Sequence, residues 1–152
     1  MRFKDLIDEP CTISRPLGVL GDRWTLVVVK QAFAGTRRFE DFLAALRISR
    51  SRLADRLERL VADGILRKEP YADTRTRHEY RLTQKGLDLY PVLQAIRAWG
   101  DRYMAPEGAP LRYRHRACGG EPRVRLVCSE CEAELSAHDV RVELGPGFPT
   151  GA

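Results

Sequence analysis

The strongest constraint on the fold is a change in the spacing of apolar residues between positions 39 and 82. Apolar residues first recur every three or four positions, as on one face of a helix, in two short runs. Two short runs rich in strand-forming side chains follow, on either side of a turn-forming segment. The pattern predicts two short helices, two strands and a long helix, at residues 39–46, 49–63, 65–69, 78–82 and 84–103.

Local signals mark where these elements begin and end. Asp22, Ser49 and Thr83 are residue types that cap helices, because their side-chain oxygens accept hydrogen bonds from the free N–H groups of a first turn. Gly64 follows the helix predicted at 49–63, and glycine readily adopts the backbone conformation that ends helices. A further helix, largely buried, is predicted at 24–34.

Length and composition limit the number of domains. The 152 residues, 43% hydrophobic and 31% charged, suit one soluble domain with an appendage. No apolar run approaches the roughly 20 residues of a membrane helix, and the first residues lack the apolar segment of a secretion signal. We therefore expect a cytoplasmic protein with no membrane partner. The predicted main domain, linker, small tail and flexible end are residues 1–104, 105–110, 111–144 and 145–152.

Positive charge is concentrated in one stretch of the chain. Residues 37–81 hold 12 Lys/Arg against 8 Asp/Glu, which is +4 of the net charge of +5, whereas residues 111–152 are balanced, six against six. A basic helix followed by a basic hairpin is typical of a surface that contacts nucleic-acid phosphates. The order of elements predicts a mainly helical (α+β) fold, a winged helix-turn-helix whose second helix enters the major groove of double-stranded DNA.

The residues predicted to contact DNA lie on that helix and in the hairpin. With Leu53 at the centre of the buried face, helix geometry turns the neighbouring polar residues toward solvent. Arginine can bind a phosphate or guanine, serine a phosphate or base, and aspartate can accept from cytosine or orient an arginine. The predicted DNA-binding residues are Ser49, Arg50, Ser51, Arg52, Asp55, Arg56, Arg59, Arg75 and Arg77. Ordinary solvated surface residues are the alternative.

Several blocks of sequence resemble a known family, and they occur in the same order. The blocks are GDRWTL at 21–26, FEDF at 39–42, IS at 48–49, residues 53–60, DGILR at 63–67 and EYRLTQKG at 79–86. Together they resemble the HxlR-type winged helix-turn-helix regulators, a bacterial-type family, over about three-fifths of the chain. The resemblance implies a homodimer, formed through the terminal helices, that binds a pseudo-palindromic operator as repressor or activator. A surplus apolar strip at 84–103 agrees with a dimerisation helix.

Cys11 is a candidate redox-reactive thiol. The resemblance implies a cysteine just before the first helix, which in some family members senses oxidants or electrophiles, although Thr12 here replaces the usual proline. A reactive thiol needs a lowered pKa, which a helix N-terminus and nearby Arg15 could supply. A buried, inert cysteine is the alternative.

The tail carries two pairs of potential metal ligands. His115 and Cys118, and then Cys128 and Cys131, are each separated by two residues, which is the spacing of zinc-binding knuckles. The tail resembles a zinc ribbon, and its strand-like pieces are too short to form a core without metal. Four protein ligands would leave no position for water, so we expect a structural zinc. Use of His138 or a carboxylate as fourth ligand, or loss of the metal, are alternatives.

No catalytic motif rises above chance. The chain has no phosphate-binding loop, no nucleotide-binding glycine pattern and no serine-histidine-acid or paired-carboxylate arrangement. We therefore expect a non-enzymatic, sequence-specific DNA-binding regulator that acts as a homodimer on an inverted-repeat operator. The alternatives are a metal- or redox-responsive sensor that uses the tail or Cys11, and a protein-interaction adaptor that does not bind DNA.

Overall fold

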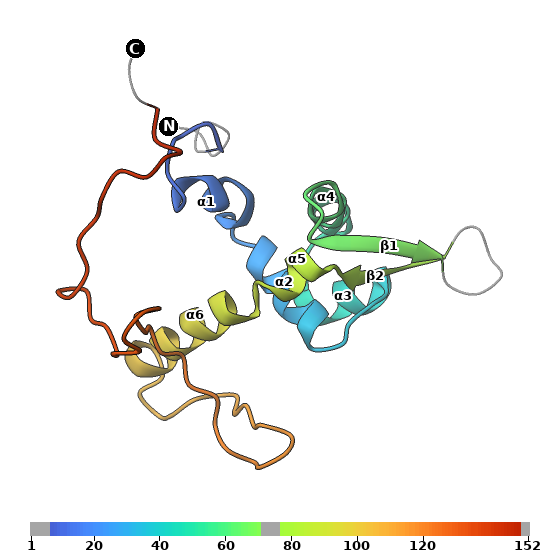
Figure 1. Ribbon diagram of the computed structural model, residues 1–152. Coiled ribbons are helices and arrows are strands. Elements are labelled where there is room, and N and C mark those ends of the chain that lie inside the picture. The colour runs from blue at the N-terminus through green and yellow to red at the C-terminus, as the bar shows by residue number, and fades with distance from the viewer. Residues whose placement is uncertain (1–6, 71–76, 150–152) are drawn as a thin grey trace. The chain divides into compact units, whose positions relative to one another are not determined.

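The computed structural model describes residues 7–70 and 77–149 as helices, a two-stranded sheet and an extended tail (Figure 1). The elements are α1 (Ser14–Leu20), α2 (Thr25–Phe33), α3 (Phe39–Leu46), α4 (Arg50–Ala62), β1 (Leu66–Pro70), β2 (His78–Leu82), α5 (Gln84–Leu87) and α6 (Tyr90–Tyr103). The predicted helix-dominated fold with a small sheet is confirmed. The chain divides after Tyr90 into two compact units, and the linker predicted at 105–110 lies inside the second. No helix of the described part is long and apolar enough to span a membrane.

The core of the first unit lies between α2, α3, α4 and the sheet. On α4 the side chains at i, i+4 and i+7, Leu53, Leu57 and Leu60, are almost completely buried, as helical spacing predicts. Val28 of α2 and Phe42 of α3 are fully buried with them. Each such side chain stabilises the fold by roughly 1.5–3 kcal/mol relative to exposure. This packing fixes which face of α4 is left to solvent.

β1 and β2 form an antiparallel hairpin whose register places one apolar face on the core. Leu66 pairs with Leu82, and both side chains are buried. Tyr80 of β2 is also buried and meets the ring of Phe42 edge-on at 6.5 Å between centroids. The backbone N–H of Tyr80 donates to the carbonyl of Arg37 at 2.8 Å, so the segment before α3 lies against the hairpin. The hairpin of β1 and β2, which we call the wing, is therefore held in a fixed orientation against the helical core.

A close backbone contact joins the hairpin to α5. The hydroxyl of Thr83 donates to the carbonyl of Gly64 at 2.5 Å and accepts from the N–H of Gly86 at 3.1 Å, which confirms the predicted cap. A Cβ atom on Gly86 would lie 2.3 Å from the backbone oxygen of Ile65. Gly64 ends the preceding turn with φ +69°. The junction thus requires glycine at both positions.

The prediction of one continuous helix from 84 to 103 is wrong. α5 ends at Leu87 and a separate helix, α6, begins at Tyr90. Pro91 explains the break, because it has no N–H to donate to the carbonyl of Leu87 and is tolerated only in the first turn of a helix. The resemblance implied a helix after Cys11, but the bounds of α1 were not predicted.

The second unit consists of α6 and the tail, and Arg97 joins them. Its Nη2 donates to the carbonyl of Pro122 at 3.2 Å, and its guanidinium lies 5.0 Å from the ring centre of Tyr113. Among the described residues from 105 to 149 no side chain is buried. The strand-like pieces predicted there form a single bridge, between Val127 and Glu134.

Candidate nucleic-acid interface

The turn between α3 and α4 determines how α4 begins. Arg47 follows α3 with a left-handed backbone (φ 51°), Ile48 buries its side chain, and Ser49 is extended. Helix α4 then starts at Arg50, so Ser49 occupies the predicted cap position, although its hydroxyl makes no cap hydrogen bond. It lies 3.5 Å from the hydroxyl of Ser51 instead. Two helices joined by so tight a turn form a helix-turn-helix.

The face of α4 opposite its leucines is open to solvent. The predicted DNA-contacting residues that are exposed on it or beside it are Ser49, Arg50, Ser51, Arg52, Asp55 and Arg59. Within the described part of the chain, Arg52 has no hydrogen-bond or ion-pair partner. Its guanidinium is therefore available to a phosphate or a base without breaking an internal contact. Exposure of these residues is confirmed, and their contact with DNA stays a prediction.

Arg50 is held by a residue of α3. Its Nη1 and Nη2 donate to the two carboxylate oxygens of Glu40 at 2.7 and 2.9 Å, and it lies 5.4 Å from the ring centre of Phe39. The hydrogen bond from Arg50 lowers the pKa of the Glu40 carboxyl, and in return Glu40 raises the pKa of Arg50. Both side chains are about two-thirds exposed, so water and salt screen the pair. A DNA phosphate would compete with Glu40 for this guanidinium.

Asp55 orients a neighbouring arginine, which is one of its two predicted roles. Its Oδ1 accepts from Nε of Arg59 one helical turn later, at 3.2 Å. Asp55 also lies 3.7 Å from Arg56, at the edge of the open face.

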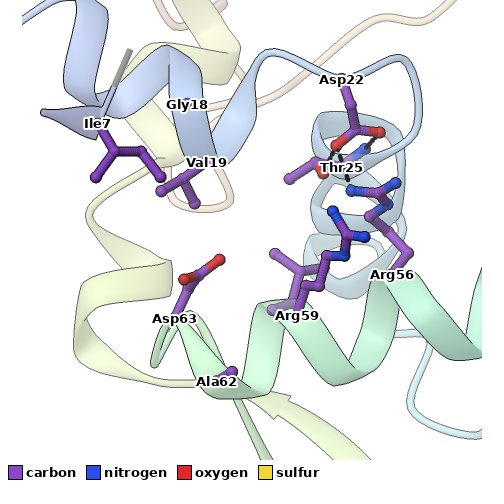
Figure 2. A pocket seen from close by; sticks show the side chains of 10 residues that line it. Ile7, Gly18, Val19, Asp22, Thr25, Arg56, Arg59, Ala62 and Asp63 are labelled. Atoms are coloured by element: carbon purple, nitrogen blue, oxygen red, sulfur yellow. Dashed lines mark hydrogen bonds and ion pairs between the residues drawn. The ribbon is translucent and has the colours of Figure 1, made fainter. Parts of the chain in front are cut away.

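Arg56 has a role that the sequence pattern did not indicate. Its side chain is only 17% exposed, and its Nη1 donates to Oδ2 of Asp22 at 2.7 Å. Asp22 also accepts from the N–H of Trp24 at 2.8 Å and of Thr25 at 3.3 Å. Figure 2 shows Asp22 between the hydroxyl of Thr25, which also donates to it, and the guanidinium of Arg56. The N-cap position of α2 is Trp24 rather than the predicted Asp22, but the Asp22 carboxylate accepts the N–H groups at the start of α2 and also holds α4. The sequence feature that could have indicated this inward orientation is that Arg56 lies three residues after Leu53, beside the buried leucine stripe of α4.

The Asp22 network borders a cavity of about 290 Å³ in the first unit. Its lining combines apolar and charged side chains from the segment before α1, from α1, α2 and α4 and from the residues next to them (Figure 2). The lining residues are Ile7, Gly18, Val19, Asp22, Thr25, Arg56, Arg59, Leu60, Ala62 and Asp63.

Much of the basic charge of the hairpin is paired within it. Glu69 lies 2.5 Å from Arg67 and 3.0 Å from Arg81, and Arg81 also contacts Glu79 at 2.9 Å. The hydrogen bond from Arg67 lowers the pKa of the Glu69 carboxyl. Arg77 is exposed just before β2, whereas Arg75 lies outside the described residues. The wing contacts predicted for both stay predictions.

The cysteines occupy two different settings. Cys11 is exposed, so the alternative of a buried, inert thiol is wrong. Hydrogen bonds from the Ser14 side chain, and then from the backbone of Ser14 and Ile13, lower its pKa, and Arg15 is not among the causes. In the tail, each predicted ligand pair lies together, but in the described part no three His, Cys, Asp or Glu side chains are grouped closely enough to hold a metal ion.

Comparison with known sequences extends the resemblance noted above. A model of the HxlR-like helix-turn-helix family matches residues 19–108. The chain is 42% identical over 138 residues to an uncharacterised HTH-type transcriptional regulator of Mycobacterium tuberculosis, Rv3095, covering 90% of this chain and 87% of that protein.

Solved structures are similar over two different lengths. The crystal structure of PA1607, described as a candidate transcription factor, has a TM-score of 0.84 and 38% identity, and covers 91% of this chain and 98% of that chain. The part of this chain that the match to PA1607 leaves uncovered is shorter than the tail. The similarity to PA1607 therefore includes tail residues. The reduced form of the transcriptional regulator YodB from Bacillus subtilis has a TM-score of 0.55 and 30% identity, covering 63% and 96%. The chain belongs to the HxlR-like helix-turn-helix family of DNA-binding transcription regulators, a class of proteins that are not enzymes.

Proposed function

We propose that the chain acts as a homodimer on an inverted-repeat operator, with α4 in the major groove and the wing on neighbouring phosphates. The observation that carries this proposal is the solvent-exposed polar face of α4, on which Arg52 has no partner within the described residues. Residues near the start of a recognition helix reach base edges in this geometry. Two such helices related by two-fold symmetry would bind half-sites about one DNA turn apart. Binding to chromosomal DNA agrees with the predicted cytoplasmic location.

The dimer is supported by an exposed apolar stripe on α6. Val92, Ile96, Trp99 and Tyr103 are 43%, 49%, 60% and 62% exposed, and they lie at i, i+4, i+7 and i+11. This spacing makes a single seam along a helix, like that of a coiled coil. A second copy of α6 is the occupant that fits, because a two-fold axis pairs a surface with itself.

Operator binding is tested with duplexes selected by the protein from a random library. Arg52→Ala should weaken binding by about 1–3 kcal/mol if Arg52 reads a base, and should relax sequence preference at one position of each half-site. A pure phosphate contact should instead lower the salt slope by about one. Arg112→Ala, an exposed arginine of the tail, is the matched control. If both variants bind selected duplexes like the wild type, α4 does not read DNA through Arg52.

A second candidate function is redox-responsive regulation through Cys11. The thiol is exposed and its pKa is lowered by Ser14, which favours the reactive thiolate. A similar regulator, YodB, is known in a structure described as its reduced form. Treatment with a quinone or hypochlorite should change operator affinity in the wild type and not in Cys11→Ser. An equal response in both would assign the effect to other residues.

A further inference from the structure

The first ligand pair of the tail lies on a tightly hydrogen-bonded turn. The N–H of Gly119 donates to the carbonyl of His115 at 2.8 Å, and the N–H of His115 donates to the carbonyl of Gly120 at 2.8 Å. Gly119, directly after Cys118, has a φ of +71°. The two bonds bring residues 115 and 118 to the same side of the turn, where their side chains meet.

The second pair lies on a turn of the same construction. The N–H of Glu132 donates to the carbonyl of Cys128 at 3.0 Å, and the N–H of Cys128 donates to the carbonyl of Ala133 at 2.9 Å. Glu132, directly after Cys131, has a φ of +58°. The two turns therefore share the spacing of their candidate ligands, the pattern of backbone hydrogen bonds and the left-handed residue directly after the second ligand. Glutamate adopts this conformation less readily than glycine, so the surroundings must compensate for it.

Within each turn, the two candidate ligands lie next to each other. Nδ1 of His115 lies 3.1 Å from Sγ of Cys118. Two such atoms bound to one tetrahedral zinc would be roughly 3.6 Å apart, given the usual zinc–nitrogen and zinc–sulfur lengths. The distance between Nδ1 of His115 and Sγ of Cys118 therefore needs to increase by only about half an ångström. In the second turn, backbone groups of Cys131 and Glu130 and the side chain of Cys131 form hydrogen bonds with Cys128, so the two cysteines of this pair lie together as well.

The rest of the tail supports both turns without supplying a core. Arg97 of α6 contacts Tyr113 and Pro122, which flank the first turn on its two sides. The second turn is closed by the bridge from Val127 to Glu134. No described residue from 105 to 149 is buried, so apolar packing does not join the turns.

We propose that the two turns close on one zinc ion, with Nδ1 of His115 and the sulfurs of Cys118, Cys128 and Cys131 as its four ligands. The ion takes the place of a hydrophobic core and joins turns that the described residues leave as separate pairs. Four protein ligands fill the tetrahedral shell, which makes the site structural and not catalytic. His138 is outside this set, because its N–H donates to Ser136 at 3.3 Å in a turn of different construction.

The first measurement is the zinc content of the full chain, purified without chelator under reducing conditions, by native mass spectrometry and elemental analysis. We expect one zinc per chain in the wild type and in His138→Ala, and none in the double variant Cys128→Ser, Cys131→Ser. The double variant should keep its DNA binding if only the tail loses order, and this readout separates metal loss from general misfolding. One zinc retained by the double variant would overturn the proposal.

Cobalt substitution and nuclear magnetic resonance test the ligand set directly. Cobalt(II) added to the chelated chain should produce the visible absorption of tetrahedral cobalt with thiolate ligands, weakened in Cys118→Ser. A wild-type chain that neither carries zinc nor produces this absorption would overturn the site. Long-range ¹⁵N spectra of the zinc-loaded chain should show Nδ1 of His115 bound and Nε2 protonated. The reverse pattern would overturn the assignment of His115.

Discussion

Asp22 Oδ2 lies 2.7 Å from Arg56 Nη1, although 34 residues separate them in the chain. The same carboxylate accepts the first N–H groups of α2, so the orientation of α4 is tied to the start of α2. Both side chains are mostly buried, at 26% and 17% exposure. The pair is therefore screened less by solvent than the exposed ion pairs of α4.

Replacing Asp22 with alanine should lower the free energy of unfolding by about 2 kcal/mol, because it removes the acceptor of the N–H groups at the start of α2 and leaves the mostly buried Arg56 without its hydrogen-bond partner. Thermal or urea unfolding measures the change. Asp41→Ala, an exposed aspartate in the first turn of α3, is the control and should lose less than about 1 kcal/mol. Equal losses in both variants would show that the contact with Arg56 adds nothing.

Gly86→Ala should destabilise the protein by about 1–3 kcal/mol, because the added Cβ would stand 2.3 Å from the backbone oxygen of Ile65 and 3.0 Å from Leu82 Cδ2. Gly100→Ala makes the opposite prediction. Its Cβ meets no atom within 4 Å, and alanine is favoured over glycine in a helix by roughly 0.8–1 kcal/mol. Unfolding curves for the two variants should move in opposite directions, and a shift of both in the same direction would contradict this account.

Glu40→Gln should strengthen DNA binding and steepen its salt dependence by up to about one unit, because it removes a negative charge and frees Arg50 for a phosphate. Anisotropy titrations at several salt concentrations measure both quantities. Glu107→Gln removes the same charge from an exposed position in the second unit and should leave the salt slope unchanged. A weaker complex for Glu40→Gln would mean that Glu40 positions Arg50 rather than competing for it.

Trp99→Glu should convert the proposed dimer to a monomer, raising the dissociation constant more than about a hundredfold, because a charge would be buried at the centre of the proposed apolar seam. Sedimentation velocity over a range of concentrations reports the change. Ala98→Glu introduces the same charge on the same helix away from the seam and should remain dimeric. A wild-type chain that sediments as a monomer would remove the basis for two-fold operator binding.

Alkylation of Cys11 should reach half its maximal rate at a pH below that of an ordinary thiol, since hydrogen bonds from Ser14 and Ile13 stabilise the thiolate. The lowered pKa makes the thiolate present at lower pH and protonated only as the pH falls further. Peptide mapping by mass spectrometry after timed iodoacetamide pulses isolates this cysteine from those of the tail. Ser14→Ala should move the midpoint to higher pH, and an unchanged midpoint would argue against the hydrogen bond.

The amphipathic elements were predictable because their signal is local. The spacing of Leu53, Leu57 and Leu60 identifies the buried face of α4 and, with it, the exposed face that carries Arg52. The two strands were predicted within a residue of their observed ends, since alternation and a turn-forming segment mark a hairpin. The break before α6 was missed, because the apolar spacing continues past Pro91 although the backbone hydrogen bonds do not.

The sequence by itself determined the helices α2, α3 and α4, the two strands of the wing and the face of α4 that meets solvent, because each of these depends on neighbours a few positions apart. Only the tertiary structure decided which arginines are available to DNA. Arg52 is open within the described residues, Arg50 is paired to Glu40, and Arg56 is turned inward to Asp22. All three are arginines within about two turns of one helix, and what distinguishes them is whether folding brings a carboxylate beside the guanidinium. Such partners lie ten or more residues away, beyond the reach of any local pattern.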